Sequence, residues 1–292
     1  MSLGLGLGLG LGAHRRVDYG NMPATFTVTS GDGTKYIRVR VSETTTVTPA
    51  GGTSIRIGGS GEFVTTSLTL AANTNQDIYF NGAGSLTIPR RKLVTSLYLD
   101  SLGSSVITGD ITGMKLTYLY LYNIGSSVIT GNITGMKLTT LSLYNIGSSI
   151  ITGKITGMKL TYLRLYNIGS SVITGDITGM ELTTLFLSSI GSSLTYGTNS
   201  LNITNNNGIQ LLGNTVFSAS EYIQLFADAA TCVTDGKWTA STKVMTISGG
   251  ENPGWSNVEG YYDIIVNGGV LVKVPIAWES GEDPFPPETP NP

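Results

Sequence analysis

Histidine and cysteine, on which many catalytic and metal sites depend, each occur once in this sequence. His14 precedes Arg15 and Arg16 near the start of the chain, where we expect it to be solvated. Ser-His-Asp or Cys-His catalysis would have to use this one histidine. A multi-histidine metal site and an internal disulfide are excluded. Cys232 lies in the mixed stretch AATCVTDG, where we expect a small buried apolar side chain.

Paired carboxylates are the other common route to hydrolysis, because glycosidases need two of them close together. Asp110 and Asp176 occupy one position of an internal repeat, three copies apart, with Asn132 and Lys154 between them. If the copies stack at about 5 Å each, these carboxylates lie about 15 Å apart, beyond the separation found even in inverting enzymes. We therefore predict no catalytic residues, no metal and no cofactor, and interpret this column as a solvated edge.

The repeat that carries these residues is 22 residues long and begins at Val94. Three central copies are nearly identical, and the last copy is degenerate. The five copies read VTSLYLDSLGSSVITGDITGMK, LTYLYLYNIGSSVITGNITGMK, LTTLSLYNIGSSIITGKITGMK, LTYLRLYNIGSSVITGDITGME and LTTLFLSSIGSSLTYGTNSLNI. Five units of this length are enough to form the core of a solenoid.

The apolar residues recur at fixed positions of every copy. One isolated coil cannot bury them all, but stacked coils would align them into columns, each buried aliphatic side chain contributing roughly 1.5 to 3 kcal/mol before chain entropy is subtracted. No ten-residue stretch has helical spacing, so we expect the returning side of each coil to be extended or a short 3₁₀ turn. The copy that begins at Leu116 shows the set: Leu116, Leu119, Leu121, Ile124, Val128 or Ile129, Ile133 and Met136.

The spacing in LTYLYLYNI resembles the leucine-rich repeat family, whose unit reads L-x-x-L-x-L-x-x-N-x-L. ITGNITGM is similar to the L-x-G-x-I-P-x-x-L portion of receptor-type repeats, with Thr in place of Pro, and the resemblance covers residues 94 to about 203. The resemblance implies that the family's asparagine ladder is absent or displaced to Asn123, Asn145 and Asn167. The position where the family carries Asn holds Leu102, Ile124, Ile146, Ile168 or Ile190.

The same resemblance implies that the third, fifth and seventh positions of each copy point from a parallel sheet into solvent. All seven aromatic residues between Val94 and Glu181 fall at these positions. Tyrosine combines a flat apolar surface with a hydrogen-bonding tip, which suits sugar rings and protein partners. The alternative is that tyrosine only fills space on an exposed strand. The candidate binding residues are Tyr98, Tyr118, Tyr120, Tyr122, Tyr144, Tyr162, Arg164, Tyr166 and Phe186.

Residues 21–93 predict an N-terminal β domain or the opening coils of the solenoid, because short alternating runs are separated by Gly, Asn and Pro. TFTVTS, GDG and TKYIRVRV form a hairpin signal. Further strands are expected over residues 54–57, 67–70, 78–80 and 85–88. Within TKYIRVRV, one face would carry Ile37, Val39 and Val41 and the other Tyr36, Arg38 and Arg40.

Residues 204–278 predict a small C-terminal α+β cap that seals the open end of the solenoid. Ser220 is expected to cap a helix through EYIQLFADA, and Ser256 a second helix through NVEGYYDIIVN. KWTASTKVMTIS and VLVKVPIAW are expected to be strands, with Trp238, Trp255 and Trp278 in the core of the cap. Residues 279–292 are acidic and proline-rich and predict an extended tail. The predicted fold class is mainly β, a leucine-rich-repeat-like solenoid between a β module and this cap.

Residues 1–20 begin MSLGLGLGLGLGAHRR, in which the positive charges follow the apolar run. A signal peptide has the opposite order, and Gly at every second position leaves too little apolar surface for a helix to enter a bilayer, so we expect no membrane insertion. The segment is interpreted either as a disordered tail or as an anchoring strand that becomes ordered in an assembly. The candidate anchor residues are Leu3, Leu5, Leu7, Leu9 and Leu11.

The formal net charge is −2, from 17 basic and 19 acidic residues, so nucleic acid is not an expected partner. The Gly-Leu start resembles the N-termini of virion proteins of tailed bacteriophages that infect gut bacteria. We therefore expect a non-enzymatic structural or adhesive virion protein, a fibre-like or decoration component present in multiple copies. Its partners would be other virion proteins or a host-surface glycan or protein. The alternatives are a secreted or surface-exposed bacterial leucine-rich repeat adhesin and a polysaccharide-degrading fibre.

Overall fold

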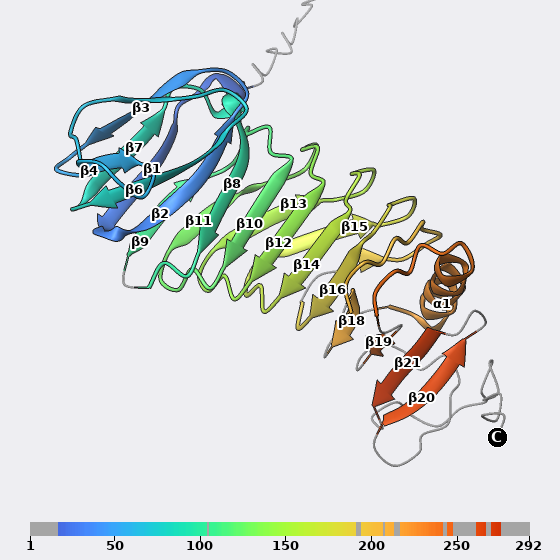
Figure 1. Ribbon diagram of the computed structural model, residues 1–292. Coiled ribbons are helices and arrows are strands. Elements are labelled where there is room, and N and C mark those ends of the chain that lie inside the picture. Colours follow the sequence, from blue (N-terminus) through green and yellow to red (C-terminus); the bar gives the residue numbers. More distant parts are fainter. Residues whose placement is uncertain are drawn as a thin grey trace, which may run out of the picture.

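Two β-sheets dominate the structure, a computed structural model of the 292-residue chain (Figure 1). It describes residues 17–103, 105–190, 194–206, 208–212, 217–241, 244–247, 261–266 and 270–275. One sheet has nine strands in the order β17-β15-β13-β11-β9-β1-β7-β3-β5. The other has twelve, in the order β20-β21-β19-β18-β16-β14-β12-β10-β8-β2-β6-β4. The mainly β fold class is confirmed.

The elements have the following bounds. The nine-stranded sheet consists of β1 (Ala24–Ser30), β3 (Thr45–Ala50), β5 (Leu68–Leu70), β7 (Gly84–Ile88), β9 (Val106–Asp110), β11 (Val128–Asn132), β13 (Ile150–Lys154), β15 (Val172–Asp176) and β17 (Leu194–Thr195). The twelve-stranded sheet consists of β2 (Asp32–Val41), β4 (Ser54–Ile57), β6 (Asn75–Asn81), β8 (Val94–Asp100), β10 (Tyr118–Tyr122), β12 (Thr140–Tyr144), β14 (Tyr162–Tyr166), β16 (Thr184–Ser188), β18 (Ile209–Leu212), β19 (Val244–Ile247), β20 (Tyr261–Val266) and β21 (Val270–Pro275). The helices of the described part are the 3₁₀ turns η1 (Tyr19–Asn21) and η2 (Arg91–Leu93) and the α-helix α1 (Ala219–Thr234).

The 22-residue copies stack in register as a β-solenoid, and each coil contributes one strand to each sheet. On one side of the solenoid, Leu119 lies beside Leu97 on β8 and Leu141 on β12, each 22 residues away. The return strands β9, β11, β13 and β15 pair in parallel on the other side. The predicted apolar columns form the core, since Leu119, Leu121 and Ile129 are fully buried. The predicted solenoid and its extended return are confirmed.

A ladder of buried serines runs through this core. The Oγ of Ser149 accepts a hydrogen bond from the backbone N–H of Ile129 in the preceding coil at 2.9 Å and donates to the carbonyl of Ser127 at 3.3 Å. Ser127 and Ser171 make the equivalent contacts. Each serine thus satisfies backbone groups where the chain turns inside the solenoid and the regular sheet ladder is interrupted.

An asparagine ladder forms at Asn123, Asn145 and Asn167, the displaced position that the resemblance allows. Asn123, Asn145 and Asn167 have φ angles of 46° to 48°, a left-handed conformation that asparagine tolerates better than most residues. Asn145 Nδ2 donates to Asn123 Oδ1 at 2.9 Å, and Asn167 Nδ2 donates to Asn145 Oδ1 at 3.0 Å. These asparagines lie outside the core and order the corner where each coil leaves the twelve-stranded sheet.

The N-terminal strands extend both sheets of the solenoid (blue in Figure 1). β1 pairs antiparallel with β9, and β2 pairs antiparallel with β8. The hairpin predicted around Gly31 is therefore wrong, because β1 and β2 belong to different sheets and the turn crosses between them. The predicted facing of β2 is correct: Ile37, Val39 and Val41 are buried in the core. The four further strands predicted in this region exist, as β4, β5, β6 and β7.

The C-terminal region continues the twelve-stranded sheet and adds α1 (Figure 1). The first predicted helix is present, but its N-cap is Ser218 rather than Ser220, because Glu221 completes a capping box with Ser218. The second predicted helix is wrong over Tyr261–Val266, which forms β20 and pairs antiparallel with β21. Strands are confirmed over Val244–Ile247 and Val270–Pro275.

Two carboxylates attach α1 to the last coil. Asp228 is buried and accepts hydrogen bonds from the Tyr196 hydroxyl at 2.9 Å and the Asn199 backbone N–H at 2.7 Å. Glu221 accepts from the backbone N–H of Tyr196 at 2.7 Å. Trp238 is buried beside this attachment, as is the single cysteine, Cys232. The Gly-Leu leader with Leu3–Leu11, His14, Trp255, Trp278 and the acidic tail lie outside the described residues.

Ser149→Ala tests the buried serine ladder. The free energy of unfolding should fall by about 1 to 3 kcal/mol, because the Ile129 N–H would lose its acceptor inside the core. The neighbouring Ser148 is exposed, so Ser148→Ala is the matched control and should change the stability by no more than about 0.5 kcal/mol. Urea denaturation followed by circular dichroism measures both variants, and equal effects would contradict the role given to Ser149.

Candidate functional site

The outward side chains of β8, β10, β12, β14 and β16 form the candidate site, here called the tyrosine face. Alternate residues of these strands point away from the core, and the sheet register sets them in columns across the five strands. The rings are half-buried, because neighbouring coils cover their sides. The tyrosine face consists of Tyr98, Tyr118, Tyr120, Tyr122, Tyr144, Tyr162, Arg164, Tyr166 and Phe186. The structure thus brings all nine predicted binding residues onto one surface.

Stacked rings order this face. Tyr122, Tyr144 and Tyr166 form a continuous stack with centroid distances of 4.5 and 4.4 Å and interplanar angles of 14°. Tyr98 and Tyr120 stack in the next column at 4.6 Å and 9°. These spacings follow the distance between paired strands, about 4.7 to 4.9 Å, so the sheet imposes the stack. Because each ring covers the flat side of its neighbour, the stack presents ring edges and phenolic hydroxyls outward.

Arg164 interrupts the aromatic columns and lies among their rings. Its guanidinium carbon is 4.4 Å from the centroid of Tyr144 and 5.1 Å from that of Phe186. Both distances are within the range of a cation–π interaction. Arg164 has no ion-pair partner among the residues that the structure describes. A fixed positive charge therefore lies within an aromatic surface.

Four of the short outward side chains are buried, which corrects the expectation that all three columns are solvated. Ser142 is fully buried, and Thr184 is 7 % exposed. Ser96 and Ser188 are buried as well. Large rings in neighbouring positions stand higher than these short side chains and cover them. Ser142 Oγ and Thr184 Oγ1 have no hydrogen-bond partner among the residues that the structure describes.

Burial and a nearby carboxylate shape the acidity of the phenols. Burial raises the pKa of Tyr120 to about 12, and the negative charge of Asp100 adds to the shift. The pKa of Tyr98 is raised further, by burial and by the hydrogen bond that its hydroxyl donates to Asp100 Oδ2 at 2.7 Å. Burial also raises the pKa of Tyr118. Tyr98, Tyr118 and Tyr120 therefore keep neutral phenols through the physiological range.

A hollow lies at each end of the tyrosine face. The hollow at the N-terminal end has a volume of about 230 Å³ and lies between Tyr98, Tyr118 and two arginines of β2, Arg38 and Arg40. Arg38 is engaged there, since its guanidinium pairs with Asp77 at 2.6 Å.

The hollow at the C-terminal end has a volume of about 480 Å³. Its residues from the solenoid are Tyr162, Arg164, Thr184 and Phe186, and Asn205, Asn206 and Gln210 complete it. The repeat pattern predicts neither hollow, because Arg38, Arg40, Asn205, Asn206 and Gln210 lie outside the five repeats.

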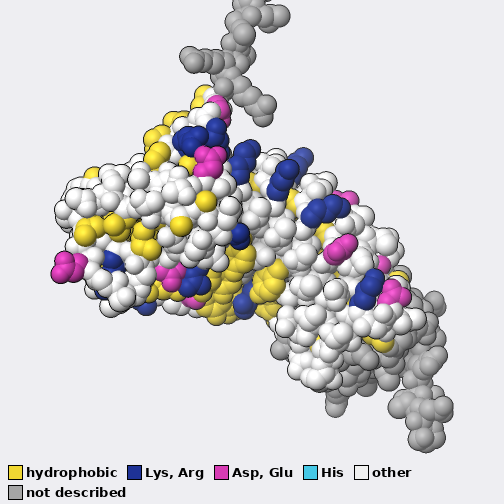
Figure 2. All heavy atoms as spheres, turned by 45° about the horizontal axis from the view of Figure 1, so that its top comes forward, with side chains coloured by type: hydrophobic (Ala, Val, Ile, Leu, Met, Phe, Trp, Pro, Cys, Tyr) yellow, Lys and Arg dark blue, Asp and Glu magenta, His cyan; other side chains and the backbone are white. Residues whose placement is uncertain are grey.

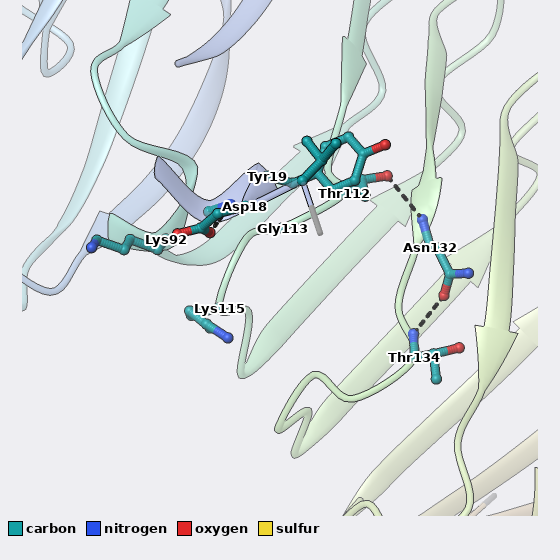
Figure 3. Close-up of a pocket in the computed structure, with 10 residues that line it drawn as sticks. Asp18, Tyr19, Lys92, Thr112, Gly113, Lys115, Asn132 and Thr134 are labelled. Carbon is teal, nitrogen blue, oxygen red and sulfur yellow. Dashed lines mark hydrogen bonds between the residues drawn. The ribbon is translucent and has the colours of Figure 1, made fainter. Parts of the chain in front are cut away.

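A third hollow, of about 760 Å³, lies away from the tyrosine face, where η1 meets the first coils (Figure 3). Lys92 and Lys115 line it together with a hydrogen-bonded chain formed by Thr112, Asn132 and Thr134. None of its described residues has a buried polar side-chain atom without a partner. The hydrogen bonds among these residues stabilise the turns between coils.

A row of exposed lysines occupies the last position of three successive copies. Lys115, Lys137 and Lys159 follow one another at intervals of 22 residues and have no ion pair within the described part of the chain. Basic side chains spaced along one edge are visible in Figure 2. This lysine row is the main alternative surface for an anionic partner.

The aspartates considered above for hydrolysis form turns. Asp110 Oδ1 and Asp176 Oδ1 accept the backbone N–H of Thr112 at 2.9 Å and of Thr178 at 2.7 Å, respectively. Arg91 also pairs with Asp110 at 2.6 Å. Burial raises the pKa of Asp110, but the hydrogen bonds from Thr112 and Arg91 outweigh it and lower the pKa overall. Within the described residues, no three His, Cys, Asp or Glu side chains lie close enough together to bind a metal ion.

Comparison with known proteins does not extend this description. The chain matches no protein-family model, no curated protein and no solved structure. The β-solenoid of about five turns rests on the register of the strands, and the tie to leucine-rich repeat proteins remains a resemblance of the repeat. None of the helices in the described part is long and apolar enough to cross a bilayer.

Alkaline titration tests the environment of the tyrosine face. The folded pKa of Tyr120 is about 12 and the unfolded value about 10, so the native state holds the proton more tightly. The stability contributed by this shift is complete below about pH 10 and is lost as the pH rises toward about 12. Urea unfolding between pH 8 and pH 11 should show this alkaline decrease, and Tyr120→Phe should show less of it. A variant that loses stability as steeply as the wild type would contradict the assignment.

Proposed function

We propose that this chain is a non-enzymatic adhesive and structural protein that presents the tyrosine face to a surface glycan or a partner protein. The observation that carries the proposal is the stack of Tyr122, Tyr144 and Tyr166 at 4.4 to 4.5 Å, held in place by the sheet beneath it. Half-buried, stacked rings lose little conformational freedom when a partner binds, so more of the contact energy remains as affinity. Tyrosine and arginine are also the residues that contribute most to binding at protein interfaces.

The form of the face favours an extended, flat partner. The phenolic hydroxyls and ring edges repeat at the spacing of the strands, about 4.7 to 4.9 Å, across several coils. A polysaccharide or the exposed face of a protein can contact several of these groups at once. The hydrophobic patch that crosses the solenoid in Figure 2 supports such a contact.

We place this adhesive protein in the virion of a tailed bacteriophage, as a fibre-like or decoration component. Support for this setting comes from the Gly-Leu start of the sequence and from the stiff repeat array, which suits a component that projects from an assembly. Mass spectrometry of purified phage particles should detect the chain in many copies.

The binding role is tested by a double variant at the end of the face away from the larger hollow. Tyr98→Ala combined with Tyr120→Ala removes one stacked pair, and we expect binding of the labelled chain to gut-bacterial cells to weaken by about tenfold or more. Flow cytometry over a panel of strains measures the binding. Tyr19→Ala is the matched control, because Tyr19 is 46 % exposed and lies on η1, outside the tyrosine face. Unchanged cell binding by a double variant with native thermal stability would overturn the proposal.

A further inference from the structure

We propose that the 480 Å³ hollow at the C-terminal end of the tyrosine face binds an acidic sugar unit. This inference rests on the proposed adhesive function and names the chemical class of its ligand. The hollow lies where a small side chain follows a large one at the C-terminal end of the tyrosine face: Thr184 lies next to Tyr162. β18 adds Gln210 beside Phe186 and forms the far side.

An unsatisfied hydroxyl lies in the wall of this hollow. Thr184 lines the hollow and is 7 % exposed, and its buried Oγ1 has no hydrogen-bond partner among the described residues. A buried hydroxyl without a partner destabilises the fold, so its presence calls for an explanation. A rotation about the Cα–Cβ bond of Thr184 would turn Oγ1 into the hollow, where a ligand hydroxyl can donate to it and accept from it.

Arg164 supplies the charge that selects an anionic group. The guanidinium stacks between Tyr144 and Phe186, which fixes its orientation, and no described carboxylate pairs with it. Guanidinium groups only donate hydrogen bonds, and a carboxylate can accept two of them in parallel. The group that fits next to Arg164 is therefore the carboxylate of an acidic sugar.

The remaining lining residues suit the rest of a pyranose ring. The side-chain amides of Asn205 and Gln210 make no hydrogen bond within the described part of the chain, and each both donates and accepts, as sugar hydroxyls do. The ring of Tyr162 has no stacking partner among the described residues. Its flat side is thus open to the C–H groups of a sugar, unlike the rings inside the stack. Aromatic surface, two-way hydrogen bonding and one cation together favour a sugar acid over a purely apolar or cationic ligand.

The ligand class is tested with matched sugars on the full chain. The probes are a disaccharide that ends in glucuronate, the same disaccharide with glucose at that end, and an N-acetylneuraminate glycoside. Calorimetry and saturation-transfer NMR should show an acidic sugar binding about tenfold or more tighter than the neutral one, because only the acid offers Arg164 a charged hydrogen-bond acceptor. Equal affinities, or no binding of either acid at millimolar concentration, would overturn the proposal.

Two variants assign the binding to this hollow. Arg164→Gln should reduce acid binding to the level of the neutral sugar. Thr184→Val replaces the unsatisfied hydroxyl by a methyl group of similar size, and should weaken both sugars about fivefold without lowering the melting temperature. Ser142→Ala is the matched control, since its buried hydroxyl is also unsatisfied but does not line the hollow, and sugar binding should not change.

Other outcomes point elsewhere and would each overturn the inference. If Lys137→Gln removes acid binding while Arg164→Gln does not, the acid binds along the lysine row. If an oligoglutamate peptide binds in an Arg164-dependent way and the sugars do not bind, the hollow recognises a protein carboxylate. Failure of the adhesive function can be told apart from failure of the sugar site. The double variant Tyr98→Ala with Tyr120→Ala tests cell binding separately, at the opposite end of the face. Loss of cell binding there, with no sugar binding at Arg164, leaves adhesion standing and removes only the sugar site.

Discussion

Parallel pairing between residues 22 positions apart is the constraint on which this structure depends. It aligns leucine with leucine and isoleucine with isoleucine, so that each coil completes the core of its neighbours. The same register sets serine below serine at the buried turn and asparagine beside asparagine at the outer corner. A slip by one residue would turn every leucine outward and every tyrosine inward, and no polar ladder would survive it.

The repeat made the solenoid predictable, because periodic apolar residues specify both the spacing of the coils and the side of each strand that is buried. The pairing partners of non-repeated strands were not predictable in the same way. The alternation in β1 and β2 is compatible with a hairpin or with a crossing between sheets, and only the neighbours β9 and β8 decide between them. Tyr261–Val266 is rich in aromatic and β-branched residues, but its strand depends on pairing with β21, later in the chain.

In the candidate site, too, only the part that belongs to the repeat was predictable. All nine face residues followed from the repeat, whereas the hollows depend on residues beyond it, such as Arg38 from β2 and Gln210 from β18. The sequence also gave no sign that the rings would cover each other's flat sides. Because the stacked rings cover one another, the middle of the tyrosine face presents phenolic hydroxyls and ring edges. Open ring surface remains at its C-terminal end, around Tyr162. The C-terminal end of the tyrosine face is thus chemically distinct from its middle.

The near identity of the central copies has a genetic consequence. Stretches of DNA that encode almost the same 22 residues can recombine out of step, which removes or inserts whole units without shifting the reading frame. Because each coil contacts only its two neighbours, an inserted coil would find the same surroundings as the existing ones. The length of the rod, and with it the number of tyrosines on show, can therefore evolve in discrete steps while both ends stay unchanged.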